Sequence, residues 1–205
     1  MARPKGDAAA NAARRQDILK AAFNVFSKVG YTQSSLSQIA EIVGMTEAGI
    51  LHHFKTKANL LTRVLEYRDE LTNANFYSED ATGLGFVKNW INLIDYNISI
   101  PGMVELFCVL SAEATKESHP AHEFFKTRYA ATIALAKEAM TDLQANGHIY
   151  EDLNPEDLGR ALIALSDGLQ VQWLLDRKWD MLEEHKAFFR RIMNDEGIAL
   201  AGLNQ

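Results

Sequence analysis

The stretch Ser35–Phe54, SLSQIAEIVGMTEAGILHHF, contains the signals for two short helices separated by a tight turn. Ser35 and Gln38 have the spacing of a capping box, in which each side chain bonds a free amide at a helix start. Gly44 tolerates the left-handed backbone that a tight turn requires, and Thr46 is a favourable cap for the second helix. These proportions predict a helix-turn-helix, whose second helix enters the major groove of DNA.

The second helix of the pair, residues 47–54, has the features expected of a helix that lies against DNA. Ala48 and Gly49 add little bulk at its start, which allows the backbone to come close to the bases. Lys55 and Lys57 follow directly and are placed to meet phosphate groups. A solvated corner of the chain is the alternative interpretation of these two lysines.

The remainder of the chain is also predicted to be helical, because apolar residues recur at spacings of three and four. No pair of alternating segments joined by a hairpin turn is present. We therefore predict an all-α fold, with an N-terminal three-helix helix-turn-helix domain followed by a larger helical domain, to which ligand binding and dimerisation are assigned below. The predicted divisions are a flexible N-terminal arm (1–11), the DNA-binding domain (12–56) and the regulatory domain (57–205). The predicted helices, besides those of the opening motif, are 12–29, 57 to the middle seventies, one around Trp90, 103–117, 120–146, 155–176 and 181–200.

Charge is distributed unevenly along the chain. The net charge is -6, but residues 1–68 hold ten Lys or Arg and five Asp or Glu, whereas the rest holds 11 and 22. The first part is therefore basic and the second acidic. This asymmetry favours a polyanionic partner at the N-terminal end.

Several classes of protein are disfavoured by what the sequence lacks. One cysteine, Cys108, permits no internal disulfide and fits a reducing compartment. There is no run of about 18 apolar residues, and the basic start has no apolar stretch after it as a secretory signal would. We expect a cytoplasmic protein without a membrane partner. A nucleophile elbow, a phosphate-binding glycine loop and a metal cluster are also missing, so the rival interpretation as a helical enzyme or carrier is disfavoured and no cofactor is expected.

Many fixed spacings in the first third of the chain coincide with one known pattern. The chain resembles the DNA-binding domain of the TetR family of repressors over about residues 12–65. Residues 167–173, DGLQVQW, are similar to a late helix of many members. The motifs that carry the resemblance are Ile18-Leu19, Ala21-Ala22, Phe26, Gly30-Tyr31, Ser34-Ser35-Leu36, Ile39-Ala40, Gly44-Met45-Thr46, Gly49-Ile50, His52-His53-Phe54-Lys55-Thr56-Lys57 and Leu60-Leu61.

The resemblance implies which residues contact DNA. The chain departs from the family pattern at Leu51, where Tyr is common, and at Glu47, where Lys is common. The Glu47 carboxylate either accepts a hydrogen bond from a cytosine amino group or repels phosphate. The phosphate contacts implied are Ser35, His53 and Lys57, and the residues near the bases are Thr46, Glu47, Ala48 and Gly49, with Lys55 added from its position.

Two basic pairs have alternative interpretations. His52 and His53 resemble a zinc pair, but adjacent residues on a helix point about 100° apart and no third ligand lies near, so no metal site is predicted. His53 is instead expected to face phosphate. Arg14 and Arg15 are either an ordinary exposed helix start or part of a basic arm that follows the DNA backbone.

Polar and aromatic residues within the apolar helices of the second domain are candidates for a small-molecule effector site. Each has a simpler interpretation, in which the tryptophans belong to the core, Glu113 pairs with Lys116, and His122 is exposed at a helix start. The candidates are Trp90, Asn97, Phe107, Glu113, His122, Phe125, Tyr129, Gln170 and Trp173.

The last two predicted helices carry more apolar residues than the end of a small domain requires, which favours a homodimer. In the resembling family these helices form a four-helix bundle with their counterparts, and the two-fold dimer presents two recognition helices to a palindromic operator. We expect a repressor that an effector releases from double-stranded DNA by favouring another dimer shape. An activator, or an adaptor controlled by a protein partner, is the alternative. The apolar residues are Leu158, Leu162, Leu165, Leu169, Leu182, Phe188, Phe189, Ile192 and Met193.

Overall fold

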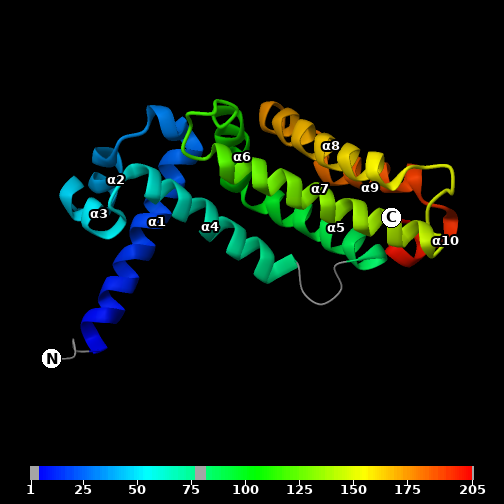
Figure 1. Ribbon diagram of the computed structural model, residues 1–205, viewed down its shortest axis with the longest axis horizontal. Coiled ribbons are helices and arrows are strands. Elements are labelled where there is room, and N and C mark those ends of the chain that lie inside the picture. Colours follow the sequence, from blue (N-terminus) through cyan, green and yellow to red (C-terminus); the bar gives the residue numbers. More distant parts are fainter. Residues whose placement is uncertain (1–4, 77–81, 205) are drawn as a thin grey trace. The chain divides into compact units, whose positions relative to one another are not determined.

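The computed structural model describes residues 5–76 and 82–204 of the chain. Over these ranges it contains ten helices and no β-strand, which confirms the predicted all-α class (Figure 1). The helices are α1 Lys5–Gln33, α2 Leu36–Val43, α3 Glu47–Phe54, α4 Lys57–Phe76, α5 Gly83–Ser99, α6 Pro101–Glu113, α7 His122–Ala145, α8 Pro155–Leu175, α9 Met181–Ile192 and α10 Asp195–Ala201.

The described residues divide into two compact units, each considered by itself below. The N-terminal unit comprises residues 5–69 and 105–125, and the C-terminal unit comprises 70–76, 82–104 and 126–204. The N-terminal unit therefore includes the start of α4 and the end of α6 as well as the helix-turn-helix. The predicted functional boundary after residue 56 stays a prediction.

The helix-turn-helix forms through the local signals that its sequence contains. The Ser35 hydroxyl accepts a hydrogen bond from the Gln38 amide at 3.2 Å, and the Gln38 side chain accepts one from the Ser35 amide at 2.8 Å. Gly44 adopts the left-handed conformation with φ 63°, and the Thr46 hydroxyl caps α3 by accepting from the Gly49 amide at 3.2 Å. The predicted capping box, turn and cap are all confirmed.

An apolar core holds α1 to α4 together in the N-terminal unit. Helix α2 packs against both α1 and α3. Burying a side chain of this kind stabilises the fold by roughly 1.5–3 kcal/mol relative to leaving it exposed. The fully buried side chains are Ile18, Phe26, Ile39, Ile50, Leu60, Leu61 and Leu65.

Helix α1 is longer than the sequence predicted. It begins at Lys5, so residues 5–11 of the predicted flexible arm are helical, while residues 1–4 lie outside the described residues. The stretch Ala8–Ala13, AAANAA, is rich in the residue with the highest helix propensity. Gly30 does break the helix as predicted, with φ 73°, and one further turn follows it.

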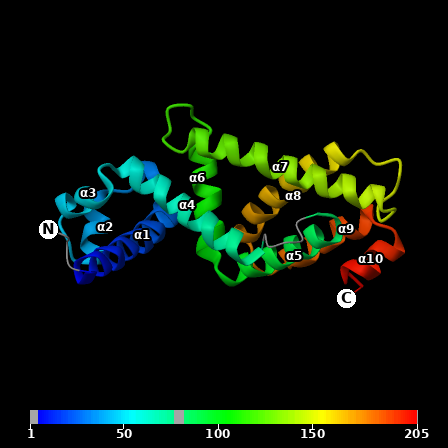
Figure 2. The same ribbon diagram turned by 60° about the horizontal axis from the view of Figure 1, so that its bottom comes forward.

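The C-terminal unit is a helical bundle in which α9 packs against both α5 and α8 (Figure 2). Helices α7 and α8 approach closely at Gly159, where a Cβ atom would lie 2.7 Å from the Lys137 backbone nitrogen. Within the two described ranges no single helix is long and apolar enough to cross a bilayer. Helices α5 and α6 reach that length and composition only together, across a bend of 99°.

The predicted last helix, 181–200, is wrong because the structure contains two helices there. Met193 has extended backbone, with ψ 150°, which ends α9. The Asn194 side chain then accepts a hydrogen bond from the Gly197 amide at 2.9 Å and caps α10. The Asn194 amide itself donates to the His148 carbonyl at 3.1 Å. This partner, far away in sequence, favours the break over a continuous helix.

Candidate nucleic-acid interface

Helix α3 has one buried side and an exposed amino-terminal end. Ile50 and Phe54 are buried in the core of the N-terminal unit. Thr46, Glu47 and Ala48 are exposed, and Gly49 is half-buried with its amide bonded to Thr46. The end of α3 that the sequence assigned to DNA bases is therefore on the surface, as a recognition helix requires.

Ser35 and His53 lie on either side of this exposed end in sequence, and both are partly accessible. The Ser35 hydroxyl also donates to the Gln38 side chain at 3.2 Å, so its role in the structure is to cap α2. Burial lowers the pKa of His53, and the positive charges of His52, Arg15 and Arg14 lower it further. Both effects favour the neutral ring, and a phosphate contact by His53 stays a prediction.

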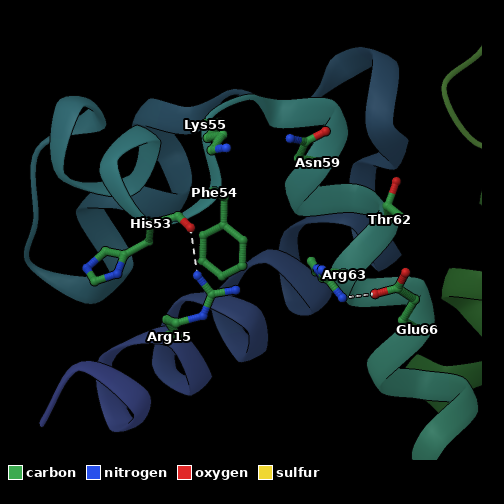
Figure 3. A pocket seen from close by; sticks show the side chains of 8 residues that line it. All are labelled: Arg15, His53, Phe54, Lys55, Asn59, Thr62, Arg63 and Glu66. Atoms are coloured by element: carbon green, nitrogen blue, oxygen red, sulfur yellow. Dashed lines mark hydrogen bonds and ion pairs between the residues drawn. The ribbon is translucent and has the colours of Figure 1, made fainter. Parts of the chain in front are cut away.

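A hollow of about 400 Å³ lies beside the carboxyl end of α3 (Figure 3). We call it the cationic groove, since three of its residues are cations and one is an acid. That acid, Glu66, lies 2.6 Å from the Arg63 guanidinium, and a dashed line marks the pair in Figure 3. The excess of positive charge makes the groove attractive to an anion. The groove is lined by Arg15, His53, Phe54, Lys55, Asn59, Thr62, Arg63 and Glu66.

Arg15 connects α1 to the end of α3. Its guanidinium donates to the His53 carbonyl at 2.7 Å and stacks over the Phe54 ring, 4.6 Å from the centroid. The carbonyls at a helix carboxyl end carry partial negative charge, which a cation stabilises. Arg15 is therefore a structural part of the groove wall. Neither interpretation of the Arg14–Arg15 pair, as an exposed helix start or as an arm that follows DNA, is tested by these contacts.

Lys55 has an unusual backbone conformation. It is the only non-glycine residue with positive φ (62°) in the part of the chain that the structure describes, and its amide donates to the Leu51 carbonyl at 2.7 Å. Such a conformation is strained by on the order of 1–3 kcal/mol and is enriched at functional sites. The sequence indicated Lys55 by its charge, but contained no signal for this backbone.

Lys57 is engaged within the protein rather than extended into solvent. Its ammonium donates to the carbonyls of Tyr31 and Ser34, at 2.5 Å each, and lies 4.4 Å from the centroid of the Tyr31 ring. Burial lowers the pKa of Lys57, and the negative charge of Glu113 partly offsets this. Two of three N–H donors are used in this way, so a phosphate contact by Lys57 stays a prediction.

The nine predicted effector-site residues do not belong to one unit. Trp90, Asn97, Tyr129, Gln170 and Trp173 belong to the C-terminal unit, and Phe107, Glu113, His122 and Phe125 belong to the N-terminal unit.

Within the N-terminal unit, each of these four residues has a packing or hydrogen-bonding role. Phe107 and Phe125 pack edge to face with centroids 5.4 Å apart. The His122 Nδ1 atom lies 2.8 Å from the Ala114 carbonyl. Glu113 accepts hydrogen bonds from backbone amides of the N-terminal unit. The predicted pairing of Glu113 with Lys116 is replaced by these bonds and by an ion-pair distance of 3.6 Å to His119.

Within the C-terminal unit, α5 and α9 bury polar atoms that have no hydrogen-bond partner among the described residues. These atoms are Trp90 Nε1, Asn97 Oδ1 and His185 Nε2. An unpaired buried polar atom costs roughly 1–3 kcal/mol. Burial lowers the pKa of His185, so its ring is neutral at pH 7. His185 was not predicted, because only its burial, which the sequence does not reveal, distinguishes it from a surface histidine.

The other three candidates of the C-terminal unit have partners. The Tyr129 hydroxyl donates to the Asp167 carboxylate at 2.7 Å. The Gln170 amide donates to the Ser166 hydroxyl at 3.3 Å, and Trp173 lies under the Arg177 guanidinium. These contacts are sufficient to explain the three residues without a ligand.

The apolar residues predicted for the dimer surface are mostly used inside the chain. Leu162, Leu169, Phe189, Ile192 and Met193 are buried within the chain, and the predicted homodimer through these helices stays a prediction. The other four are half-buried. The outward side of α8 instead exposes small and apolar residues at spacings of three and four: Ala161, Ala164, Gly168, Val171 and Leu175.

A capped helix pair with a left-handed turn, a second helix with an exposed start and a cationic groove beside the end of that helix define a helix-turn-helix regulator that binds DNA. The profile described as "Bacterial regulatory proteins, tetR family" matches residues 18–64, which span α1 to α4. Residues 18–64 therefore carry the DNA-binding domain typical of TetR-family transcriptional regulators.

Relatives and solved structures agree with this assignment. The HTH-type transcriptional regulator TtgR of Pseudomonas putida is 25% identical over 168 residues, which are 78% of this chain and 80% of that protein. RutR of Escherichia coli is 31% identical over 100 residues, 47% of each chain. The fold matches that of NalD, the secondary repressor of the MexAB-OprM multidrug efflux pump in Pseudomonas aeruginosa, with a TM-score of 0.69, 23% identity and coverage of 93% and 100%.

Proposed function

We propose that this protein is a repressor that binds a palindromic operator as a homodimer and is released by a small molecule. The observation that carries the proposal is that α3 exposes its amino end and has the cationic groove beside its carboxyl end. The likeness to the transcriptional regulators TtgR and RutR supports DNA binding, and NalD, which shares the fold, is a secondary repressor.

DNA contact is assigned to two surfaces, one at each end of α3. Thr46 to Gly49 approach base edges, because they form the exposed amino end of α3. Lys55, Asn59 and Arg63 contact phosphates from the cationic groove, since all three line it and are exposed. Phosphate contacts supply affinity and register, whereas the residues of α3 supply sequence preference.

The salt dependence of binding tests the phosphate assignment. Binding is measured by fluorescence anisotropy on duplexes that tile the DNA upstream of the protein's own coding sequence. Arg63→Gln is expected to reduce the slope of log K against log salt by about 0.9 for each phosphate that the protein no longer neutralises, and by about 1.8 for a two-fold dimer. Its ion pair with Glu66 is largely exposed, so the cost in stability is small.

Lys88→Gln is the matched control, because Lys88 is exposed on α5 in the other unit and its replacement changes the net charge equally. Its salt slope should equal that of the wild type. An unchanged slope for Arg63→Gln would remove the groove from the interface. If the wild type prefers none of the duplexes, the regulator proposal itself fails.

Dimerisation is assigned to the outward side of α8. Leu175 is 83% exposed and Val171 48% exposed, and small residues at Ala161, Ala164 and Gly168 allow a second helix to approach closely. We expect Leu175→Asp to shift the protein from dimer to monomer in analytical ultracentrifugation and to weaken DNA binding at low protein concentration. Leu200→Asp, at a 48% exposed leucine of α10, should do neither. A dimer unaffected by Leu175→Asp would refute this surface.

The effector is expected to bind where α5 and α9 bury unpaired polar atoms. A ligand with complementary donors and acceptors would satisfy Trp90, Asn97 and His185, which offsets part of their burial cost. A thermal-shift screen of small metabolites, followed by operator binding, tests this. A compound that raises the melting temperature and lowers operator affinity supports release by an effector. A broad panel in which no compound alters both favours the adaptor alternative.

A further inference from the structure

We propose that Glu113, at the end of α6, is a positioning residue for DNA binding, because its carboxylate holds the turn from which the helix-turn-helix begins. The proposal rests on the DNA-binding function proposed above. The turn comprises residues 31–34, between the break in α1 at Gly30 and the cap of α2 at Ser35, and we call it the clamped turn.

The amino end of the clamped turn is held by the carboxylate. One Glu113 oxygen accepts from the Tyr31 amide at 2.7 Å and the other from the Thr32 amide at 3.1 Å. Gly30, with φ 73°, turns the chain so that two successive amides face one anion, as in the anion-binding concavities that such backbone forms. A Cβ atom at Gly30 would lie 2.7 Å from the carboxylate, so the site requires glycine.

The carboxyl end of the same turn is held by Lys57. Its ammonium bonds the carbonyls of Tyr31 and Ser34. A negative group at the amino end and a positive group at the carboxyl end both match the dipole of the turn. Glu113 and Lys57 therefore fix one turn from both ends, and the turn connects α6 to the starts of α2 and α4.

His119 limits how the carboxylate can move. Its ring packs edge to face on Tyr31, with centroids 5.2 Å apart, and its Nε2 atom lies 3.6 Å from a Glu113 oxygen. That distance is too long for a hydrogen bond. The His119 Nδ1 atom accepts from the Ala121 amide, so the ring is held in place and provides a wall beside the carboxylate.

The clamp gives α6 direct influence on the orientation of α2 and α3. Helix α6 starts in the C-terminal unit, with Pro101–Val104, and ends in the N-terminal unit, with Glu113. Since hydrogen bonds weaken steeply with length and angle, a shift of about 1 Å at the end of α6 releases both amides.

Glu113→Gln tests the clamp, because it keeps the size of the side chain but replaces one acceptor oxygen with an amide donor. We expect operator affinity to fall about tenfold. The direction of this change in affinity is informative, because the loss of a negative charge from a DNA-binding unit by itself strengthens binding to phosphates. Glu117→Gln, at an exposed acid of the same unit, is the matched control and should bind equally or more tightly. Equal or tighter binding by Glu113→Gln overturns the proposal.

Amide exchange of the full chain supplies a second readout that does not depend on DNA. The Tyr31 and Thr32 amides should be protected in the wild type and in Glu117→Gln, and should exchange at least tenfold faster in Glu113→Gln. Glu113→Asp, which retains the charge but is shorter, should lie between them in both measurements. Unprotected wild-type amides refute the clamp, whereas protected amides in a wild type that binds no duplex refute the proposed function alone.

Discussion

Replacing Ala48 with glutamate is expected to lower operator affinity by at least about 100-fold without reducing thermal stability. Ala48 is exposed in the first turn of α3, so the new side chain would occupy the space between the helix and the base edges. It would also bring a carboxylate close to the phosphates of the DNA backbone, which repel it. A carboxylate near a helix amino end stabilises that helix by about 0.3–1 kcal/mol, so unfolding should be unaffected or slightly harder.

Anisotropy on the tightest wild-type duplex and circular dichroism melting measure the two effects. Ala130→Glu, at an exposed alanine of α7, changes the net charge by the same amount and should bind DNA like the wild type. If both variants lose affinity equally, only overall charge matters, and α3 is not the helix that enters the groove. A loss confined to Ala48→Glu ties binding to this helix.

Local signals made the helix-turn-helix predictable. The capping box at Ser35, the turn at Gly44 and the cap at Thr46 each act within four residues along the chain, so the sequence alone contains the whole interaction. The exposed start of α3 followed from the same reasoning. Elements whose form depends on neighbouring residues are the ones that pattern can predict.

Interactions between residues far apart in sequence were not predictable. Glu113 bonds amides about 80 residues away, and Lys57 bonds carbonyls more than 20 residues away. The break between α9 and α10 depends on His148, a distant carbonyl. From the sequence, Glu113 was interpreted as a pocket acid, Lys57 as a phosphate contact and residues 193–194 as the interior of a helix. In each case a partner far away in sequence determines the observed role.

The candidate effector residues show a further limit. A polar or aromatic residue in an apolar helix has the same sequence pattern whether it lines a pocket or packs in a core. Trp90 and Asn97 are distinguished from Gln170 only by the lack of a partner for their buried polar atoms among the described residues. The residues of the dimer surface have the same limit, because apolar periodicity does not tell which side of α8 the chain itself covers.

Gly159→Ala is expected to destabilise the protein by about 2–3 kcal/mol, within the range for forcing an extra methyl group into a packed interior. The added Cβ would lie 2.7 Å from the Lys137 nitrogen and 3.1 Å from its Cα atom. Both are backbone atoms of α7, so no side chain can rotate away and the two helices must separate. At an open helical site the same change would stabilise the protein by about 1 kcal/mol, since alanine has the higher helix propensity.

The expected fall in melting temperature is about 2–4 °C for each kcal/mol in a chain of this size, and Gly159→Val should fall further because its side chain is larger. Gly147→Ala is the control in the same unit. Gly147 has φ 72° and nothing within 4 Å of an added Cβ atom, so the substitution costs only backbone strain of about 1 kcal/mol. If Gly159→Ala melts at or above the wild-type temperature, α7 and α8 do not touch at this glycine. A larger loss of stability for Gly159→Ala than for Gly147→Ala requires a steric clash at position 159, because helix propensity alone favours alanine there.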